Sequence, residues 1–356
     1  MGEPAAPGRR SRARKRYLPG ANLPALVVLL VITAVGGLYV YSYSVALGAP
    51  RPRDVPIGVV GQRASDVERA FDAVASGSVV ATQYSSIAAA RAAIDEQHSY
   101  AALTQTSTDT ADLLISTASG PSVSRVLSAD ADSVGSALGL VVTVRDTHPV
   151  SSRDPSGVVF FYVALASVIM GFIGTIQTRS NAPALTLIGE LRWDLLRAVT
   201  VSLAITTVVG PVAQLEPVPF LPTWGVLALT SLTAGMTYAC WRLLIGNRWA
   251  MLPTWLLFVL ISSPASGGAV ADPLLPPVLA VIGRFLPTGA TVSILRDTTY
   301  FADFTHATPY VVLVVWAVVT STGWVLLRRH RVGTGVPPSV APAPPPEPST
   351  AVPAGG

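Results

Sequence analysis

Several stretches of this sequence are apolar over roughly the 18 to 20 residues that an α-helix needs to cross a lipid bilayer. The first stretch, Leu23–Leu47, carries no charge at all. Over the whole chain 50% of the residues are hydrophobic and only 12% are charged, whereas soluble domains carry about 25% charged residues. The blocks therefore predict an α-helical polytopic membrane protein. They exclude a chain that is water-soluble throughout and a chain that is disordered throughout.

Six of these blocks are predicted to be transmembrane helices. The first is longer than the apolar region of ~7–15 residues in a secretory signal peptide, so we expect an uncleaved anchor. The segment 273–295 is apolar but contains prolines and Arg284, which predicts a broken, re-entrant element before the last span. We expect a basic cytoplasmic tail at 1–22, spans at 23–47, 158–176, 198–215, 224–245, 249–270 and 309–327, a membrane domain over 157–327, and a disordered Pro/Ala-rich cytoplasmic tail at 328–356.

Residues 48–156 differ from the rest, with 12 acidic residues, 8 arginines and short-period patterning. Alternating strands and helices predict a small α/β domain inserted between the first and second spans. Helix N-caps are expected at Ser65 (with Glu68 completing a capping box), at Ser85 or Ser86, and at Ser119 or Gly120. Strands are predicted at 56–61, 78–82, 100–104, 113–116 and 140–144, and helices at 65–75, 86–96 and 121–138.

The charges are sorted along this predicted topology. The segments expected in the cytoplasm hold 14 of the 24 basic residues, and the segments expected outside hold 16 of the 20 acidic residues. This bias follows the positive-inside rule, for which the short loops carry most of the weight. We expect a multi-pass protein of the cell membrane, with both termini in the cytoplasm and residues 48–156 outside it.

The sequence contains no pattern typical of an enzyme. Its one lysine, Lys15, lies in the N-terminal tail, so there is no Gly-Lys-Ser/Thr phosphate-binding loop. Its one cysteine, Cys240, excludes an intrachain disulfide and a cysteine-based metal cluster, and the four histidines lack metal-ligand spacing. We expect no catalytic residue, no cofactor, no metal and no nucleic-acid partner. The predicted spans hold few ionisable groups, which disfavours a proton antiporter. Because the chain has no phosphate-binding loop, any ATP hydrolysis is expected on a separate subunit.

The segment 177–197 is the most informative of the predicted cytoplasmic loops. Leucines recur along it at helical spacing between charged residues, and two interpretations stay open. It forms either an interfacial amphipathic helix that leads into the third span or a coupling helix that docks on a separate ATPase. The candidate coupling residues are Leu187, Glu190, Leu191, Arg192 and Asp194.

Helix breakers are concentrated between residues 262 and 301. Small residues and prolines near the outer face of the membrane suit a gate or exit vestibule, and they equally suit a structural cap over the helix ends. The candidate residues of this gate or re-entrant motif are Pro264, Gly267, Gly268, Pro276, Pro287, Gly289 and Arg296.

Three stretches resemble a known family. They are Ser86–Gln105 ("SIAAARAAIDEQHSYAALTQ"), Asp146–Gly174 ("DTHPVSSRDPSGVVFFYVALASVIMGFIG") and Ser263–Phe301 with "SPASGG", "LLPP", "LPTGA" and "RDTTYF". Together with the order of anchor, α/β domain and later spans, they resemble permeases of the ABC-2 type transporter superfamily, in the phage-infection-protein-like (YhgE/Pip-like) branch. The resemblance covers about residues 50–327 and implies an export permease that forms a homo- or heterodimer and works with a separate ATP-binding subunit. It supplies no catalytic residues.

The sequence thus favours an integral membrane permease-like protein, the transmembrane subunit of an ABC-2 type export system. The alternatives are a non-transporting envelope scaffold or receptor and an accessory subunit of a secretion machine. The expected partners are the lipid bilayer, a second permease subunit and the ATPase.

Overall fold

The computed structural model describes residues 23–48, 51–74 and 78–337. The predicted tail 1–22 and most of the predicted tail 328–356 lie outside the described residues. Helix α1 (Leu23–Leu47) has no charged residue and an almost wholly exposed surface. Of the described residues, 23–41 belong to one compact unit and those from Ser42 onward to a second.

The prediction of six transmembrane helices is wrong. Four helices in the described part of the chain are long and apolar enough to cross a bilayer: α1, α5 (Val159–Asn181), α6 with its continuation η1 (Leu187–Val212), and α11 (Ala307–Arg331). Two shorter helices, α9 (Pro277–Gly283) and α10 (Pro287–Tyr300), are bent by 75° at the break between them and make a fifth span only if they are counted as one. These helices are those of a membrane protein, with fewer spans than the sequence predicted.

The predicted span 224–245 lies in a helix that is not one of these four. Helix α7 (Phe220–Ile245) is 26 residues long, but threonine, serine and glycine recur along it. Many of its side chains are buried, and it packs against α5, α6, α10 and α11. Because a helix enclosed by other helices is shielded from lipid, it does not need a continuous apolar surface.

The predicted span 249–270 is not a single long helix. Helix α8 (Met251–Trp255) passes into a π-helical stretch, η2 (Leu256–Ser262), and together they are shorter than a bilayer-crossing helix. The residues that follow form turns as far as η3 (Asp272–Leu274). This is the stretch in which the sequence has many helix-breaking residues. The third span is itself divided into the α-helix α6 (Leu187–Thr207) and the π-helical turn η1 (Val208–Val212).

Between α1 and α5 the chain folds into the α/β domain that the sequence predicted. Its elements are β1 (Val55–Val60), α2 (Ala64–Val74), β2 (Val79–Gln83), α3 (Ile87–Asp95), β3 (Ala101–Gln105), β4 (Thr110–Ile115), α4 (Pro121–Leu138) and β5 (Val141–Asp146). The five strands form one sheet in the order β2-β1-β3-β4-β5, with β3 and β4 antiparallel and the other pairs parallel. In its register, Ile57 of the inner strand β1 pairs with Ala81 of β2 and Ala101 of β3.

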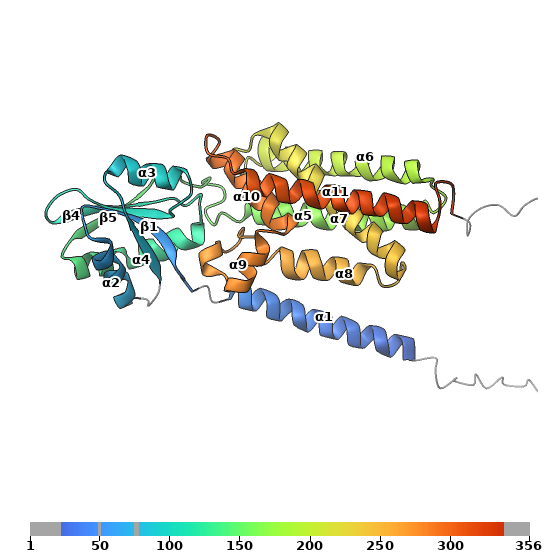
Figure 1. Cartoon of the computed structure of the whole chain (residues 1–356), viewed down its shortest axis with the longest axis horizontal. Coiled ribbons are helices and arrows are strands. Elements are labelled where there is room, and N and C mark those ends of the chain that lie inside the picture. Colours follow the sequence, from blue (N-terminus) through green and yellow to red (C-terminus); the bar gives the residue numbers. More distant parts are fainter. Residues whose placement is uncertain (1–22, 49–50, 75–77, 338–356) are drawn as a thin grey trace, which may run out of the picture. The chain divides into compact units, whose positions relative to one another are not determined.

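Helices cover both faces of this sheet (Figure 1). Helices α2 and α4 bury Phe71 and Leu127 on one face, while α3 buries Ile94 on the other. The core strands are rich in β-branched and other apolar residues because both of their faces are buried. The predicted elements of residues 48–156 are therefore confirmed.

The N-caps were predicted with mixed success. Ser86 caps α3 by accepting a hydrogen bond from the backbone N–H of Ala89, and Gly120 is the N-cap of α4. The capping box at Ser65 is wrong, because α2 already begins at Ala64. Glu68 instead accepts a hydrogen bond from the backbone N–H of Ala81, at 2.8 Å. Its carboxylate thus fastens α2 to β2.

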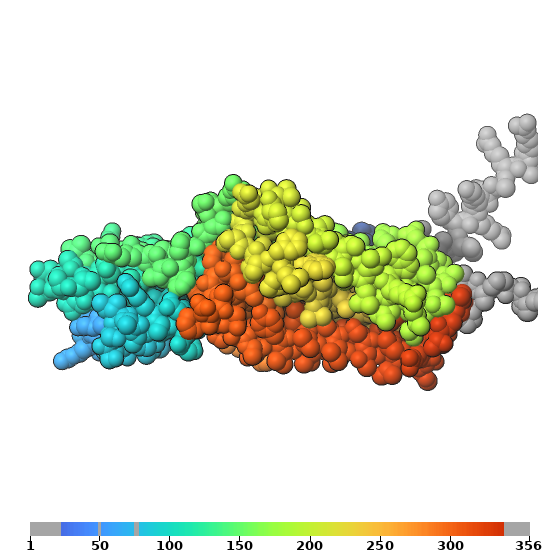
Figure 2. Space-filling view, turned by 90° about the horizontal axis from the view of Figure 1, so that it is seen from above, coloured from blue at the N-terminus to red at the C-terminus, as the bar shows by residue number. Residues whose placement is uncertain are grey.

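The longer helices after residue 158 pack around α7. Helix α11 contacts α7 and α6, and Figure 2 shows its orange and red atoms along the yellow-green atoms of these helices. Glycines allow the closest approaches: a Cβ placed on Gly171 of α5 would lie 2.3 Å from the backbone oxygen of Ser231 in α7. Small residues let helix backbones approach closely in a membrane bundle.

Candidate functional site

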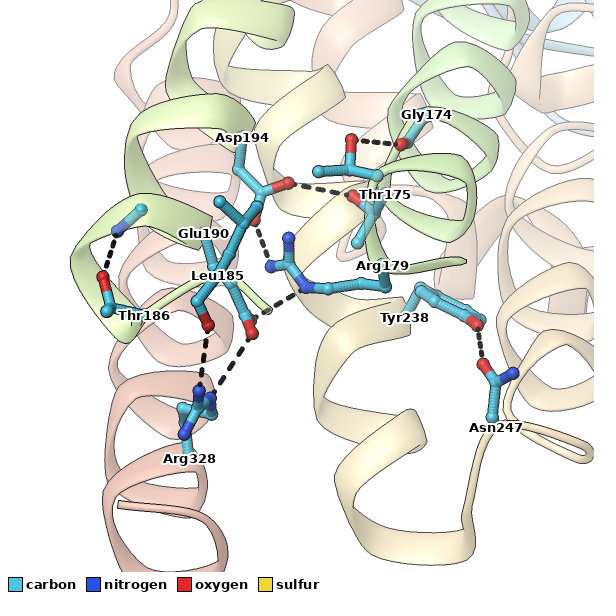
Figure 3. Close-up of polar contacts among 12 residues, drawn as sticks. Gly174, Thr175, Arg179, Leu185, Thr186, Glu190, Asp194, Tyr238, Asn247 and Arg328 are labelled. Atoms are coloured by element: carbon cyan, nitrogen blue, oxygen red, sulfur yellow. Dashed lines mark hydrogen bonds and ion pairs between the residues drawn. The ribbon is translucent and has the colours of Figure 1, made fainter. Parts of the chain in front are cut away.

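Five charged residues form a buried arginine–carboxylate network at one end of the helix bundle. It joins the C-terminal end of α5, the first turns of α6 and the C-terminal end of α11. Figure 3 shows Glu190 and Asp194 of α6 pointing toward Arg179 and Arg328. The network consists of Arg179, Glu190, Asp194, Arg197 and Arg328.

Arg179 lies at the centre of this network. Its Nε is 2.9 Å from Oε2 of Glu190, and its Nη2 donates to Oδ2 of Asp194 at 2.5 Å. Its guanidinium also lies 5.6 Å from the ring centroid of Trp324, a cation–π distance. Glu190 is 3% exposed and Asp194 is 0% exposed. Carboxylates this deeply buried are tolerated because each has an arginine partner.

A second arginine contacts the other oxygen of each carboxylate. Arg197 donates through Nη1 to Oδ1 of Asp194 at 2.7 Å and through Nη2 to Oγ1 of Thr175 at 2.6 Å. Nε of Arg328 lies 3.5 Å from Oε1 of Glu190. The network therefore spans three helices and fixes their ends relative to each other.

A turn after α11 supplies further hydrogen-bond acceptors to Arg328. Its Nη1 donates to the carbonyl oxygen of Gly333 at 2.6 Å, and its Nη2 donates to that of Gly335 at 3.0 Å. The backbone N–H of Leu187 donates to the carbonyl oxygen of Thr334 at 3.1 Å. We call Gly333–Gly335 the C-terminal clasp, because it holds α11 to the start of α6.

A cavity of about 240 Å³ opens beside the network. Arg179, Glu190 and Arg328 contribute to its wall, and Arg242 and Asn247 line it from the end of α7 and the following loop. Arg242 is half-buried, and its Nε has no hydrogen-bond partner among the described residues. Nη1 of Arg179 also has none in that part of the chain.

The polarity of α6 is inverted relative to a soluble amphipathic helix. Glu190, Asp194, Ser202 and Thr206 face the bundle, while large apolar side chains face outward. Such an arrangement suits a helix that faces lipid, where polar groups turn toward the protein interior. The exposed apolar residues of α6 are Ile188, Trp193, Leu195, Leu196, Val199 and Leu203.

The five predicted coupling residues therefore lie in different surroundings. Glu190 and Asp194 belong to the network, Leu187 is buried, Leu191 is partly buried and Arg192 is exposed. Sequence reasoning missed Arg179, Arg197, Arg242 and Arg328. The spacing of Glu190, Asp194 and Arg197 on one helical face was a signal that could have indicated an ion-paired interior stripe. The coupling role stays a prediction.

Two of the predicted gate residues, Gly267 and Arg296, are in direct contact. Pro264, Gly267, Gly268, Pro287 and Gly289 are buried, whereas Pro276 and Arg296 are partly buried. We call residues 263–300, with η3, α9 and α10, the broken element. Pro287 lies in the first turn of α10, where its missing N–H leaves no hydrogen bond unmade.

One hydrogen bond and one close backbone approach occur within the broken element. Arg296 donates through Nη2 to the carbonyl oxygen of Gly267 at 2.9 Å, and Gly267 has φ +71°, a left-handed conformation that favours glycine. A Cβ on Gly289 would lie 2.2 Å from the backbone oxygen of Gly283. The glycines are required by these close approaches.

The α/β domain is hydrogen-bonded to the broken element. Ser122 at the start of α4 accepts from the N–H of Ala271 at 3.0 Å. Arg53 donates to the carbonyl oxygen of Leu275 at 3.0 Å, and Gln97 donates to Oδ1 of Asp297 at 2.9 Å. Three separate parts of the domain thus contact one irregular segment of the bundle.

A polar cavity of about 150 Å³ lies at this junction. Hydroxyl groups dominate its lining, from Ser99, Tyr100 and Ser119 of the domain and Ser266 and Ser293 of the broken element. Burial, followed by the negative charge of Asp272, raises the pKa of Tyr100 to about 12. The Tyr100 hydroxyl therefore stays protonated at neutral pH. Gly267 and Arg296 line the same cavity.

A buried carboxyl group, Glu216, lies in the loop before α7. It is 4% exposed and accepts a hydrogen bond from the hydroxyl of Tyr300. Burial raises its pKa to about 7; the Tyr300 bond opposes this shift, and the nearby Asp154 carboxylate adds to it. Glu216 therefore changes its charge near neutral pH. No local pattern in the sequence singles it out.

We expect Glu216 to make stability fall as pH rises. Its pKa is about 7 in the folded protein against an ordinary value of 4.5. The folded protein keeps a proton that the unfolded chain releases between these values. The stabilisation is fully present below pH 4.5 and is lost as pH rises through 7; a shift of this size corresponds to roughly 3 kcal/mol.

Thermal unfolding of Glu216→Gln should depend less on pH between 5 and 8 than that of the wild type. Asp109→Asn, at an exposed loop residue, should leave the dependence unchanged, and equal profiles for all three proteins would contradict the assignment.

No family model, no curated protein and no solved structure matches this chain. Within the described residues, no group of three or more histidine, cysteine or acidic side chains is placed to hold a metal ion. The candidate site therefore rests on the network, the broken element and the junction cavity.

Proposed function

We propose that the chain is the transmembrane subunit of an export system powered by a separate ATP-binding subunit. In this proposal the α/β domain lies outside the cell, and the arginine–carboxylate network lies at the cytoplasmic end of the bundle. With the four apolar helices of the described residues all crossing the bilayer, the chain would end on the side where it began. The arginines at the ends of α5, α7 and α11 support a cytoplasmic position for that end.

The observation that carries the proposal is the bonding of the α/β domain to the broken element. The domain holds residues 271, 275 and 297 of this element through Ser122, Arg53 and Gln97. A displacement of the domain would therefore act on the bend between α9 and α10. An irregular helix pair controlled by an outer domain suits a gated exit, whereas a scaffold has no need of one.

Unpartnered hydroxyl groups inside the bundle add support. They are buried on helices that pack against one another, and in the described part of the chain they have no hydrogen-bond partner. Buried hydroxyls are normally hydrogen-bonded, so these groups would be available to a polar solute if the helices moved apart. The groups are those of Ser167, Ser202, Thr206, Thr223, Ser231 and Thr288.

Copurification tests the export function. We expect the tagged full chain, isolated from its own host in mild detergent, to bring down a nucleotide-binding subunit and vanadate-sensitive ATP hydrolysis. Arg192→Glu reverses an exposed charge on the predicted coupling helix and should weaken this association. Arg91→Glu, on the α/β domain, serves as the control. If no nucleotide-binding subunit associates, the ATP-driven proposal fails and the scaffold, receptor and secretion-accessory alternatives remain.

The orientation is tested by labelling with a membrane-impermeant maleimide. In a Cys240→Ala background, a cysteine replacing the exposed Arg91 of α3 should react in intact cells. A cysteine replacing Arg329, exposed at the end of α11, should react only after permeabilisation. The opposite pattern would show that the proposed orientation is inverted.

A further inference from the structure

We propose that the cavity beside the arginine–carboxylate network binds a phosphate group, the chemistry that a phospholipid head and free phosphate share. This inference is independent of the export function, because it concerns a binding site and requires no partner subunit.

The charges around the cavity do not balance. Four arginines, namely Arg179, Arg197, Arg242 and Arg328, lie in the network or line the cavity, against only two carboxylates, Glu190 and Asp194. Two positive charges are therefore uncompensated by carboxylates in this cluster. Isolated buried charge is costly, and a bound anion would remove much of that cost.

Two donor groups on side chains that line the cavity have no hydrogen-bond partner in the described chain. Nη1 of Arg179 is buried and has no hydrogen-bond partner in the described chain, although the other side of this guanidinium is held by Glu190 and Asp194. Nε of Arg242 is likewise buried and without a partner there. Both side chains line the cavity. Arginine is well suited to phosphate because its planar fork of donors matches the phosphate oxygens.

The cavity has the size and setting for such a group. Its volume of about 240 Å³ is several times the ~30 Å³ that one water occupies in the liquid. Asn247, in its wall, is exposed, so the cavity reaches the surface. Exposed apolar side chains follow the lining residue Leu243 along the chain, namely Leu244 and Ile245 at the end of α7 and Met251 at the start of α8. These side chains favour a lipid, whose acyl chains could cover them while its phosphate enters the cavity.

Binding is tested with the purified, delipidated full chain. Native mass spectrometry and thermal-shift titration would compare dioleoylphosphatidylglycerol, dioleoylphosphatidylcholine and inorganic phosphate. We expect the anionic lipid to be retained and to raise the unfolding temperature. Arg242→Gln should weaken its binding about tenfold, the effect of losing one charged hydrogen bond. Arg242 has no ion-pair partner in the described chain, so this variant leaves the network intact. Arg329→Gln removes an exposed arginine from the same end and should change the affinity less than twofold.

A second variant separates a binding role from a structural one. Glu190→Gln removes a competing negative charge from the cavity wall and should strengthen anion binding, even if it lowers stability. Stabilisation by inorganic phosphate alone, sensitive to Arg242→Gln, would identify free phosphate as the ligand. Equal binding by wild type and Arg242→Gln, or no binding of either phosphate source, would overturn the proposal.

Discussion

Asp194→Ala is expected to destabilise the protein by about 3–5 kcal/mol, the usual cost of removing one partner from a buried ion pair. The substitution removes the carboxylate that Arg197 contacts and one of the two that Arg179 contacts, leaving it only Glu190. The effect would be measured by thermal unfolding in detergent and by the fraction of monodisperse protein after purification.

Arg192→Ala is the matched control, two residues away on the same helix. Its side chain is exposed, so the unfolding free energy should change by no more than about 0.5 kcal/mol. Removing Arg197 together with Asp194 should restore part of the loss, because one uncompensated charge then disappears. If Asp194→Ala is no more damaging than Arg192→Ala, the network does not stabilise the bundle.

Gly171→Ala should also destabilise the bundle strongly. The added Cβ would lie 2.3 Å from the backbone oxygen of Ser231, so α5 and α7 must move apart. Overpacking of a well-packed core costs about 1–3 kcal/mol, and here the neighbouring atom is backbone and cannot rotate away. A lower unfolding temperature in detergent would report the loss.

Gly225→Ala provides the comparison. This glycine is on α7, and a Cβ there meets no atom within 4 Å. Alanine is favoured over glycine within helices by about 0.5–1 kcal/mol, so this variant should be as stable as the wild type or slightly more stable. Equal losses at the two positions would mean that the close approach of α5 and α7 is unimportant.

The α/β domain could be predicted from sequence because its signals are local. A strand buried on both faces is an apolar run bounded by turn residues, and Ser86 before an alanine-rich segment is sufficient to predict an N-cap. The capping box at Ser65 failed because Glu68 has a tertiary partner, the N–H of Ala81. No local pattern reveals such a partner.

The number of spans could not be predicted in the same way. Hydropathy measures how well a helix tolerates lipid, but α7 is largely surrounded by protein. The apolar residues of 249–270 predicted one continuous span, with prolines near its two ends. The chain instead forms a short helix, a π-helical stretch and turns there. Apolar composition alone does not separate these cases.

The network was missed because charges on a predicted cytoplasmic helix are normally solvated or bind a partner. Glu190 and Asp194 looked solvated in the sequence, yet both are buried against arginines from other helices. Their partner Arg179 is 11 and 15 residues away, across a turn, and Arg328 is more than a hundred residues away. Pairing at such distances depends on the fold.

The C-terminal clasp has a practical consequence for anyone who handles this protein. Because three backbone carbonyls of residues 333–335 bind Arg328 and the first residue of α6, a truncation or fusion joined directly after Arg331 would remove the acceptors of a fully buried guanidinium. Affinity tags and fluorescent reporters should therefore be attached beyond Pro337. A force applied to the chain from that side would reach the charged interior of the bundle through this short turn.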